Sequence, residues 1–121
     1  MNYSIFVKKA IEKDSRNTFV TYADDISKIP TDLQMFYQSY NPVNVEIDTD
    51  NGLIHFYPAE DLTELSKDYS YIGNIFVFAT INSDPIFIND KIVYTCPHGI
   101  NNPKWEKVAE SFEEYIQGLL R

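Results

Sequence analysis

The sequence YIGNIFVFATINSDPIFINDKIVYTCPHG, from Tyr71 to Gly99, contains three short apolar runs separated by polar turns. β-Branched and aromatic residues dominate the runs at 75–79, 86–88 and 92–94, and these residue types fit a pleated, packed surface. Asn82-Ser83-Asp84-Pro85 and Asn89-Asp90-Lys91 stand between the runs and favour turns. Because connections this short leave no room for a crossover helix, the strands must be antiparallel. We therefore predict an antiparallel meander as the core of a sheet.

A further pair of strands is predicted before this meander. Apolar and polar residues alternate from Val43 to Asp48, which indicates a half-buried strand. Asn51-Gly52 follows and is a strong signal for a β-hairpin. Leu53 to Tyr57 is then the return strand, and Pro58 to Leu65 predicts one or two helical turns.

Three longer helices are predicted from apolar residues at three- and four-residue spacing. The first covers Tyr3 to Lys13, with Asn2 or Ser4 as its cap. The second covers Ile29 to Asn41, where Thr31 and Gln34 have the spacing of a capping box. The third starts at Phe112, after a second such box formed by Ser111 and Glu114.

Two segments are left open by their patterns. Phe19 to Tyr22 fits either a brief edge strand or an anchored loop, and Lys104 to Glu110 fits either helical spacing or an extended chain. The rest of the order predicts a single α+β domain over residues 1–121. We expect an antiparallel β-sheet with helices packed on one face.

Composition and length exclude several classes of protein. The chain has 121 residues, 44% of them hydrophobic, which suits one packed domain and not a disordered chain. No apolar run approaches the length of a membrane span, and the opening MNYSIFVKKAIEK lacks the pattern of a secretory signal. The single cysteine, Cys96, cannot form an internal disulfide. We therefore expect a cytoplasmic location without membrane association.

The negative charge is concentrated in the middle of the chain. Residues 41–70 hold seven acidic residues against Lys67 alone, a formal charge of −6 out of a total of −8. The seven are Glu46, Asp48, Asp50, Glu60, Asp61, Glu64 and Asp68. An acidic surface repels phosphate groups, so direct binding of nucleic acid is disfavoured. The block is either a solvated face or a surface complementary to a basic protein partner.

Motifs for catalysis, cofactors and metals are weak in this sequence. Phosphate-binding glycine loops and zinc-protease motifs are missing, so we predict no cofactor and no metal site. His55 shares a predicted strand face with Leu53 and Tyr57, and we interpret it as a partly buried, hydrogen-bonded side chain. The alternative to a binding protein is a small enzyme or ligand-binding domain with a pocket near Cys96, His98 and Asp84, which needs an activated thiol.

Four motifs in order resemble the SMI1/KNR4 family, also called the SUKH superfamily. They begin with Ile29-Pro30-Thr31-Asp32-Leu33 and Phe36 to Pro42, followed by Ile75 to Thr80 with Asp84 to Ile88. Val93-Tyr94 with His98, and then Ala109 to Ile116, complete the set. Family members usually have glycines in the turn before Asp84-Pro85, where this chain has Asn82-Ser83.

The resemblance implies an α+β fold without catalytic residues. In bacteria it implies an immunity protein that binds and blocks a toxin, commonly a nuclease, of a polymorphic or contact-dependent system. The expected partner is therefore a basic toxin protein, and the acidic block at 41–70 agrees with such a partner. The eukaryotic relatives suggest a further alternative, a regulatory or scaffold module.

Overall fold

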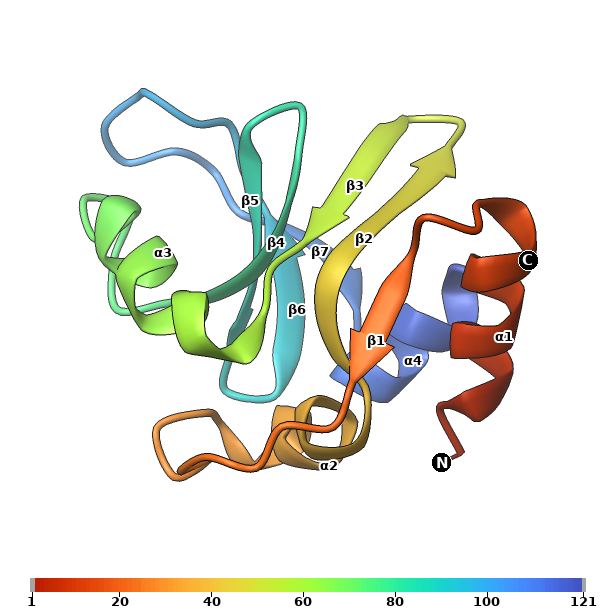
Figure 1. The fold of residues 1–121 in the computed structure, drawn as a ribbon. Coiled ribbons are helices and arrows are strands. Elements are labelled where there is room, and N and C mark those ends of the chain that lie inside the picture. Colours follow the sequence, from red (N-terminus) through yellow and green to blue (C-terminus); the bar gives the residue numbers. More distant parts are fainter. Residues whose placement is uncertain (1, 121) are drawn as a thin grey trace.

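The computed structural model describes residues 2–120, which form one antiparallel sheet with helices around it (Figure 1). The spatial order of the strands is β1-β2-β3-β4-β5-β6-β7, the same as their order along the chain. The strands are β1 (Thr18–Val20), β2 (Asn41–Thr49), β3 (Gly52–Phe56), β4 (Phe76–Ile81), β5 (Asp84–Asn89), β6 (Ile92–Thr95) and β7 (Glu106–Ala109). The helices are α1 (Ser4–Lys13), α2 (Thr31–Ser39), α3 (Leu62–Asp68), which follows a 3₁₀ turn at Ala59–Asp61, and α4 (Phe112–Gly118). The predicted α+β class with an antiparallel sheet is confirmed.

The predicted meander is β4, β5 and β6, joined by two tight turns. Asn82 and Ser83 have φ of 51° and 70°, and Asp90 and Lys91 have φ of 49° and 72°. Positive φ at both central residues gives the turn the twist that a two-residue hairpin needs. Asn and Asp tolerate this conformation better than most residues, which explains why these turns form without glycine. Asp84 and Pro85, predicted in the first turn, are instead the first residues of β5.

The larger core lies between the sheet and α1, α2 and α4. Its largest members are rings, among them Phe6, Phe36, Phe56, Phe78 and Phe112, all at most 1% exposed. The Phe36 and Phe112 rings of α2 and α4 meet at 5.4 Å in an edge-to-face arrangement. Each buried ring of this kind contributes about 1.5–3 kcal/mol through loss of apolar surface. The apolar stripes predicted from the sequence are the faces that meet here.

A second, smaller core lies on the opposite face of the sheet. It consists of Ile75, Val77, Phe87 and Cys96, with Leu65, Tyr69 and Trp105 packed around it. Figure 1 shows α3 on this side of the sheet, away from α1 and α4. The Ser66 hydroxyl of α3 accepts a hydrogen bond at 2.9 Å from the N–H of Val77, a residue of β4 that lies beyond the part paired with β3. The expected placement on one face therefore describes α1, α2 and α4, whereas α3 packs on both cores through Leu65.

Several local predictions are corrected by the structure. Thr31 is the first residue of α2 and does not cap it; the Gln34 side chain instead donates to the Ile29 carbonyl at 2.8 Å. Of the two segments left open, 19–22 begins with the last two residues of β1 and continues without a strand, and 104–110 contains β7. Strand β2 starts at Asn41, and Val43 is 39% exposed although the alternation places it inside. The register between β1 and β2 shifts at Thr18/Phe19, and this irregularity breaks the alternation.

Candidate functional site

The second face of the sheet is covered only in part. A row of paired residues crosses four strands on this face: Glu46, His55, Thr80 and Pro85. Pro85 lies two residues before Phe87, which places the row on the same side as the second core. Around β4 to β6 this side is covered by α3 and the segment after it, whereas Glu46, Asp48 and Leu53 are exposed. The exposed part, which we call the open face, consists of Glu46, Asp48, Leu53, His55 and Tyr57.

Polar contacts hold the side chains of the open face in place. His55 Nδ1 lies 3.8 Å from Glu46 Oε2, and its ring packs edge-on against Tyr57 at 4.5 Å. The Tyr57 hydroxyl is 3.1 Å from the hydroxyl of Thr80, either of which can donate. His55 is half-buried beside Tyr57, as predicted, but the nearest carboxylate, that of Glu46 on the neighbouring strand, lies beyond hydrogen-bond distance. A partner protein would meet a preformed row of polar side chains here.

The seven predicted acidic residues fall into two groups. Glu46, Asp48 and Asp50 belong to β2 and its hairpin, whereas Glu60, Asp61, Glu64 and Asp68 belong to the 3₁₀ turn and α3. All seven are exposed. Glu60 accepts a hydrogen bond from the Asn41 amide at 3.2 Å, and Glu64 pairs with Lys67 at 3.0 Å. Helix α3 covers the neighbouring part of the same side of the sheet, so the α3 group lies beside the open face, which itself contains Glu46 and Asp48 of the β2 group. Figure 1 shows α3 on this side of the sheet.

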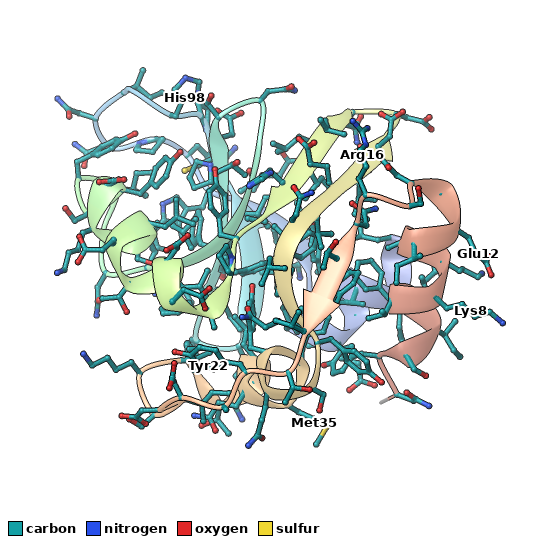
Figure 2. All side chains as sticks on the ribbon, in the orientation of Figure 1. Lys8, Glu12, Arg16, Tyr22, Met35 and His98 are labelled. Atoms are coloured by element: carbon teal, nitrogen blue, oxygen red, sulfur yellow. The ribbon has the colours of Figure 1, made fainter. Side chains whose placement is uncertain are left out.

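Two basic residues offset part of the charge of the β2 group. Lys13 and Arg16 line a hollow of about 240 Å³ together with Glu46, Asp48 and Leu53. Arg16, beside the β2–β3 hairpin in Figure 2, is held by Asp14 through Nε and Nη2 contacts of 3.0 and 2.8 Å. These contacts hold the pKa of the Asp14 carboxyl at about 2. The charge of Arg16 is therefore offset mainly by Asp14, so the negative electrostatic potential around the β2 carboxylates is only partly reduced.

A cleft of about 690 Å³ opens at the end of the sheet where the hairpins turn. Its floor contains Ile54, Ile81 and Ile86, and its far wall is Tyr115 and Leu119 of the α4 end. Acidic residues from three segments surround it: Asp48 and Asp50 of β2 and its hairpin, Asp84 of β5 and Glu106 of β7. Lys13 at the end of α1 is the basic residue among the lining residues. Sequence reasoning missed this site, because it did not bring Asp84 and Glu106 together with the hairpin.

The strand register shows which carboxylates face the cleft. Asp84 pairs with Ile81, and Glu106 pairs with Thr95, which in turn pairs with Ile86. Paired residues lie on one face, so Asp84 and Glu106 are on the side of the isoleucine floor. Asp48 pairs with Leu53 and belongs to the open face. The carboxylates of the cleft are thus Asp84 and Glu106, with Asp50 at the hairpin tip.

The predicted alternative pocket near Cys96, His98 and Asp84 is only partly assembled. Asp84 Oδ1 accepts from the His98 N–H at 2.9 Å and lies 2.7 Å from His98 Nδ1. His98 is exposed in the loop after β6, as Figure 2 shows. Cys96 is 2% exposed in the second core, and burial, with a smaller effect of Asp84, raises the pKa of its thiol. The structure joins Asp84 to His98 but gives Cys96 the surroundings of an inert, structural thiol.

Within residues 2–120, no group of three or more His, Cys, Asp or Glu side chains is arranged to hold a metal ion. The helices of this part of the chain are all too short or too polar to cross a membrane.

In comparisons with known proteins, no family model, no curated protein and no solved structure matches the chain. Its function is therefore inferred from the geometry and charge of these surfaces and from the motif resemblance.

Proposed function

We propose that this chain is a non-enzymatic protein-binding module, an immunity protein that binds and neutralises a basic toxin. The observation that carries the proposal is the open face, a sheet surface that contains Glu46 and Asp48 and lies beside the acidic side chains of the α3 group. A preformed surface of one charge favours fast and specific association with a partner of the opposite charge. The motif resemblance adds the biological context, a bacterial polymorphic or contact-dependent toxin system acting in the cytoplasm.

The charge of the surface favours a nuclease as the toxin. Enzymes that grip phosphate backbones carry basic clefts, and an acidic protein can occupy such a cleft in place of nucleic acid. Opposite charge also speeds the encounter between the two proteins, which matters for neutralising a toxin before it acts. The same charge disfavours direct binding of nucleic acid by this chain.

The alternative of an enzyme with a Cys96 nucleophile is less well supported. A nucleophilic thiol needs exposure and a lowered pKa, whereas Cys96 is buried and its pKa is raised. The Asp84–His98 pair is exposed and could serve a ligand-binding or regulatory scaffold role. Nothing in its surroundings favours that role over protein binding.

The test is a pull-down from the native host with the immobilised protein, at low and at high salt. We expect one basic protein to be retained at low salt and released as salt rises, because exposed charges are screened. The variant Glu46→Lys/Asp61→Lys takes one residue from each acidic group, and we expect it to lose the partner. The matched control is Glu12→Lys/Asp32→Lys, with the same change of charge; Figure 2 shows Glu12 on the outer side of α1.

The captured protein is then expressed in cells with and without this chain. Growth arrest that this chain relieves, and that Glu46→Lys/Asp61→Lys fails to relieve, is the expected result. Retention that is equal for both variants would show that the acidic residues do not form the contact. A partner with no effect on growth would overturn the immunity assignment and favour a scaffold.

A further inference from the structure

The cleft at the hairpin end of the sheet combines an apolar floor with an acidic rim. Ile54, Ile81 and Ile86 form the floor, and Leu119 extends it at the end of α4. Asp84 and Glu106 stand on the same side of the sheet as this floor, and Asp50 lies at the hairpin tip. With Lys13 as the basic residue of the lining, three carboxylates face one ammonium group. The cleft therefore favours a ligand that is apolar in part and positively charged.

Polar groups around the cleft have unused hydrogen-bonding capacity. Among the described residues, the carboxylates of Asp50 and Glu106 have no hydrogen-bond or ion-pair partner, and neither has the Tyr115 hydroxyl. Asp84 makes both of its contacts to His98 through Oδ1, which leaves Oδ2 without a partner in this part of the chain. Tyr115 is held by an edge-to-face contact with Phe78 at 5.8 Å, so its hydroxyl is positioned by the core. These groups are acceptors for a ligand with several donors.

We infer that this cleft receives an arginine side chain of the protein partner together with an adjoining apolar residue. The inference rests on the proposed function, because it names the part of the partner that this surface would bind. A guanidinium group is planar and has five donors, so it can reach carboxylates on two strands at once, whereas an ammonium group acts as a point charge. The volume of about 690 Å³ lies in the range of pockets that enclose a whole small ligand, roughly 300–1,000 Å³, so it has room for more than one side chain.

The cleft and the open face would then act as neighbouring parts of one interface. Asp48 lines the cleft, and its strand alternation places its side chain on the open face with Glu46. Central, enclosed contacts dominate the affinity of interfaces, and exposed charged rims affect mainly the association rate. The cleft therefore supplies the anchor, and the acidic groups supply the steering.

The test uses the capped peptide acetyl-Leu-Arg-Leu-amide and methyl NMR spectra of the full chain. We expect saturable shifts of the Ile54, Ile81, Ile86 and Leu119 methyl groups and unchanged Ile29 and Ile75 signals. The peptide with glutamine in place of arginine is expected to bind roughly tenfold more weakly or not at all, and the lysine peptide is expected to fall between the two.

The matched variants separate the cleft from general charge. Asp50→Asn/Glu106→Gln removes the charge of two exposed carboxylates at the rim of the cleft. We expect this variant to bind the arginine peptide about tenfold more weakly. Glu12→Gln/Asp32→Asn removes the same charge elsewhere and is expected to leave the binding unchanged. Equal weakening by both variants, equal binding of the glutamine peptide, or an absence of shifts in the cleft at millimolar peptide would each overturn the inference.

The peptide experiment needs no toxin, so its outcome is independent of the proposed function. If the peptide does not bind but the pull-down retains a salt-sensitive partner, only the inference of an arginine anchor would be overturned. Peptide binding in the cleft without a toxic partner would instead overturn the immunity role and leave the cleft as a site for cationic ligands.

Discussion

Asn82 in the β4–β5 turn contacts the β2–β3 hairpin directly above Gly52. Its Nδ2 donates to the Asn51 carbonyl at 3.3 Å, and a Cβ added at Gly52 would lie 2.8 Å from the same nitrogen. Gly52 has φ of +133°, which residues with a side chain rarely adopt. The two hairpins at the mouth of the cleft are therefore joined by a contact that requires glycine.

We expect Gly52→Ala to lower the free energy of unfolding by about 1–3 kcal/mol, chiefly because of backbone strain. Adding Asn82→Ala removes the side-chain contact, but it also places alanine at a φ of 51° and removes the hydrogen bond to Asn51, so we expect no recovery. The control is Gly118→Ala, where the added Cβ has no atom within 4 Å. This change in α4 is expected to be stabilising by about 0.5–1 kcal/mol. Urea unfolding of the four proteins checks the prediction, and an unchanged Gly52→Ala variant would contradict it.

The two segments with capping-box spacing are expected to lose different amounts of stability when Ser111 or Thr31 is replaced. The Ser111 Oγ accepts from the Glu114 N–H at 3.0 Å, whereas Thr31 makes no capping hydrogen bond. We expect Ser111→Ala to cost about 1 kcal/mol and Thr31→Ala to cost only a few tenths, on the order of 0.3 kcal/mol. Thermal unfolding of both variants is the measurement. Equal losses would show that Thr31 also caps its helix in solution.

Cys96 is expected to be unreactive in the folded protein. Its burial against Val77 and Phe87 raises the pKa of the thiol and blocks access. Iodoacetamide at pH 7.5 should therefore modify Cys96 slowly in buffer and rapidly in denaturant, as mass spectrometry can follow. Rapid modification of the folded chain would revive the enzyme alternative and require a movement that exposes this core.

The sequence predicted the meander because each turn has a local cause. Asn82 and Asp90, the first residue of each turn, tolerate positive φ, and the runs between the turns are too short for helices. β7 could not be predicted in the same way. Trp105, Val108 and Ala109 fit helical spacing, and only the pairing of this segment with β6, from Thr95–Glu106 to Val93–Ala109, makes it extended.

The acidic groups were predictable as a composition, but their placement was not. Charge counts along 41–70 carry no information about which residues share a face, because α3 could pack on either side of the sheet. The cleft depends on residues from distant segments, with Lys13, Asp50, Asp84 and Glu106 brought together only by the tertiary fold. Sequence reasoning assigned Asp84 to a different pocket for the same reason.

Asp14 links the stability of the fold to acidic pH. The hydrogen bond from the Arg16 side chain, with a further one from its backbone N–H, lowers the pKa of Asp14 to about 2. A lowered pKa stabilises the folded state above the pKa of the unfolded chain, about 3.9, and this contribution is lost as the pH falls towards 2. We expect Asp14→Asn to lower the melting temperature at pH 5, with a difference from wild type that shrinks by pH 2.

Arg16→Gln provides the control for this pH dependence. It removes the same ion pair from the other side, so the double variant with Asp14→Asn should be little worse than either single variant. Melting curves at low salt from pH 2 to pH 5 measure all four proteins. A difference between wild type and Asp14→Asn that stays constant with pH would show that the pair does not set the pKa of Asp14.

Tyr37 holds a buried hydroxyl group that has no hydrogen-bond partner among the described protein atoms. The side chain is 0% exposed on α2, where its ring meets Phe36 at 5.3 Å, and burial raises the pKa of its phenol. An unpaired buried hydroxyl costs stability, so we expect Tyr37→Phe to raise the free energy of unfolding by about 1 kcal/mol. Tyr57→Phe is the matched control, because the Tyr57 hydroxyl forms a hydrogen bond with the Thr80 hydroxyl. Its removal should lower stability by about 1 kcal/mol. Opposite signs in urea unfolding are the expected result, whereas a loss of stability in Tyr37→Phe would show that a buried water pairs with this hydroxyl in solution.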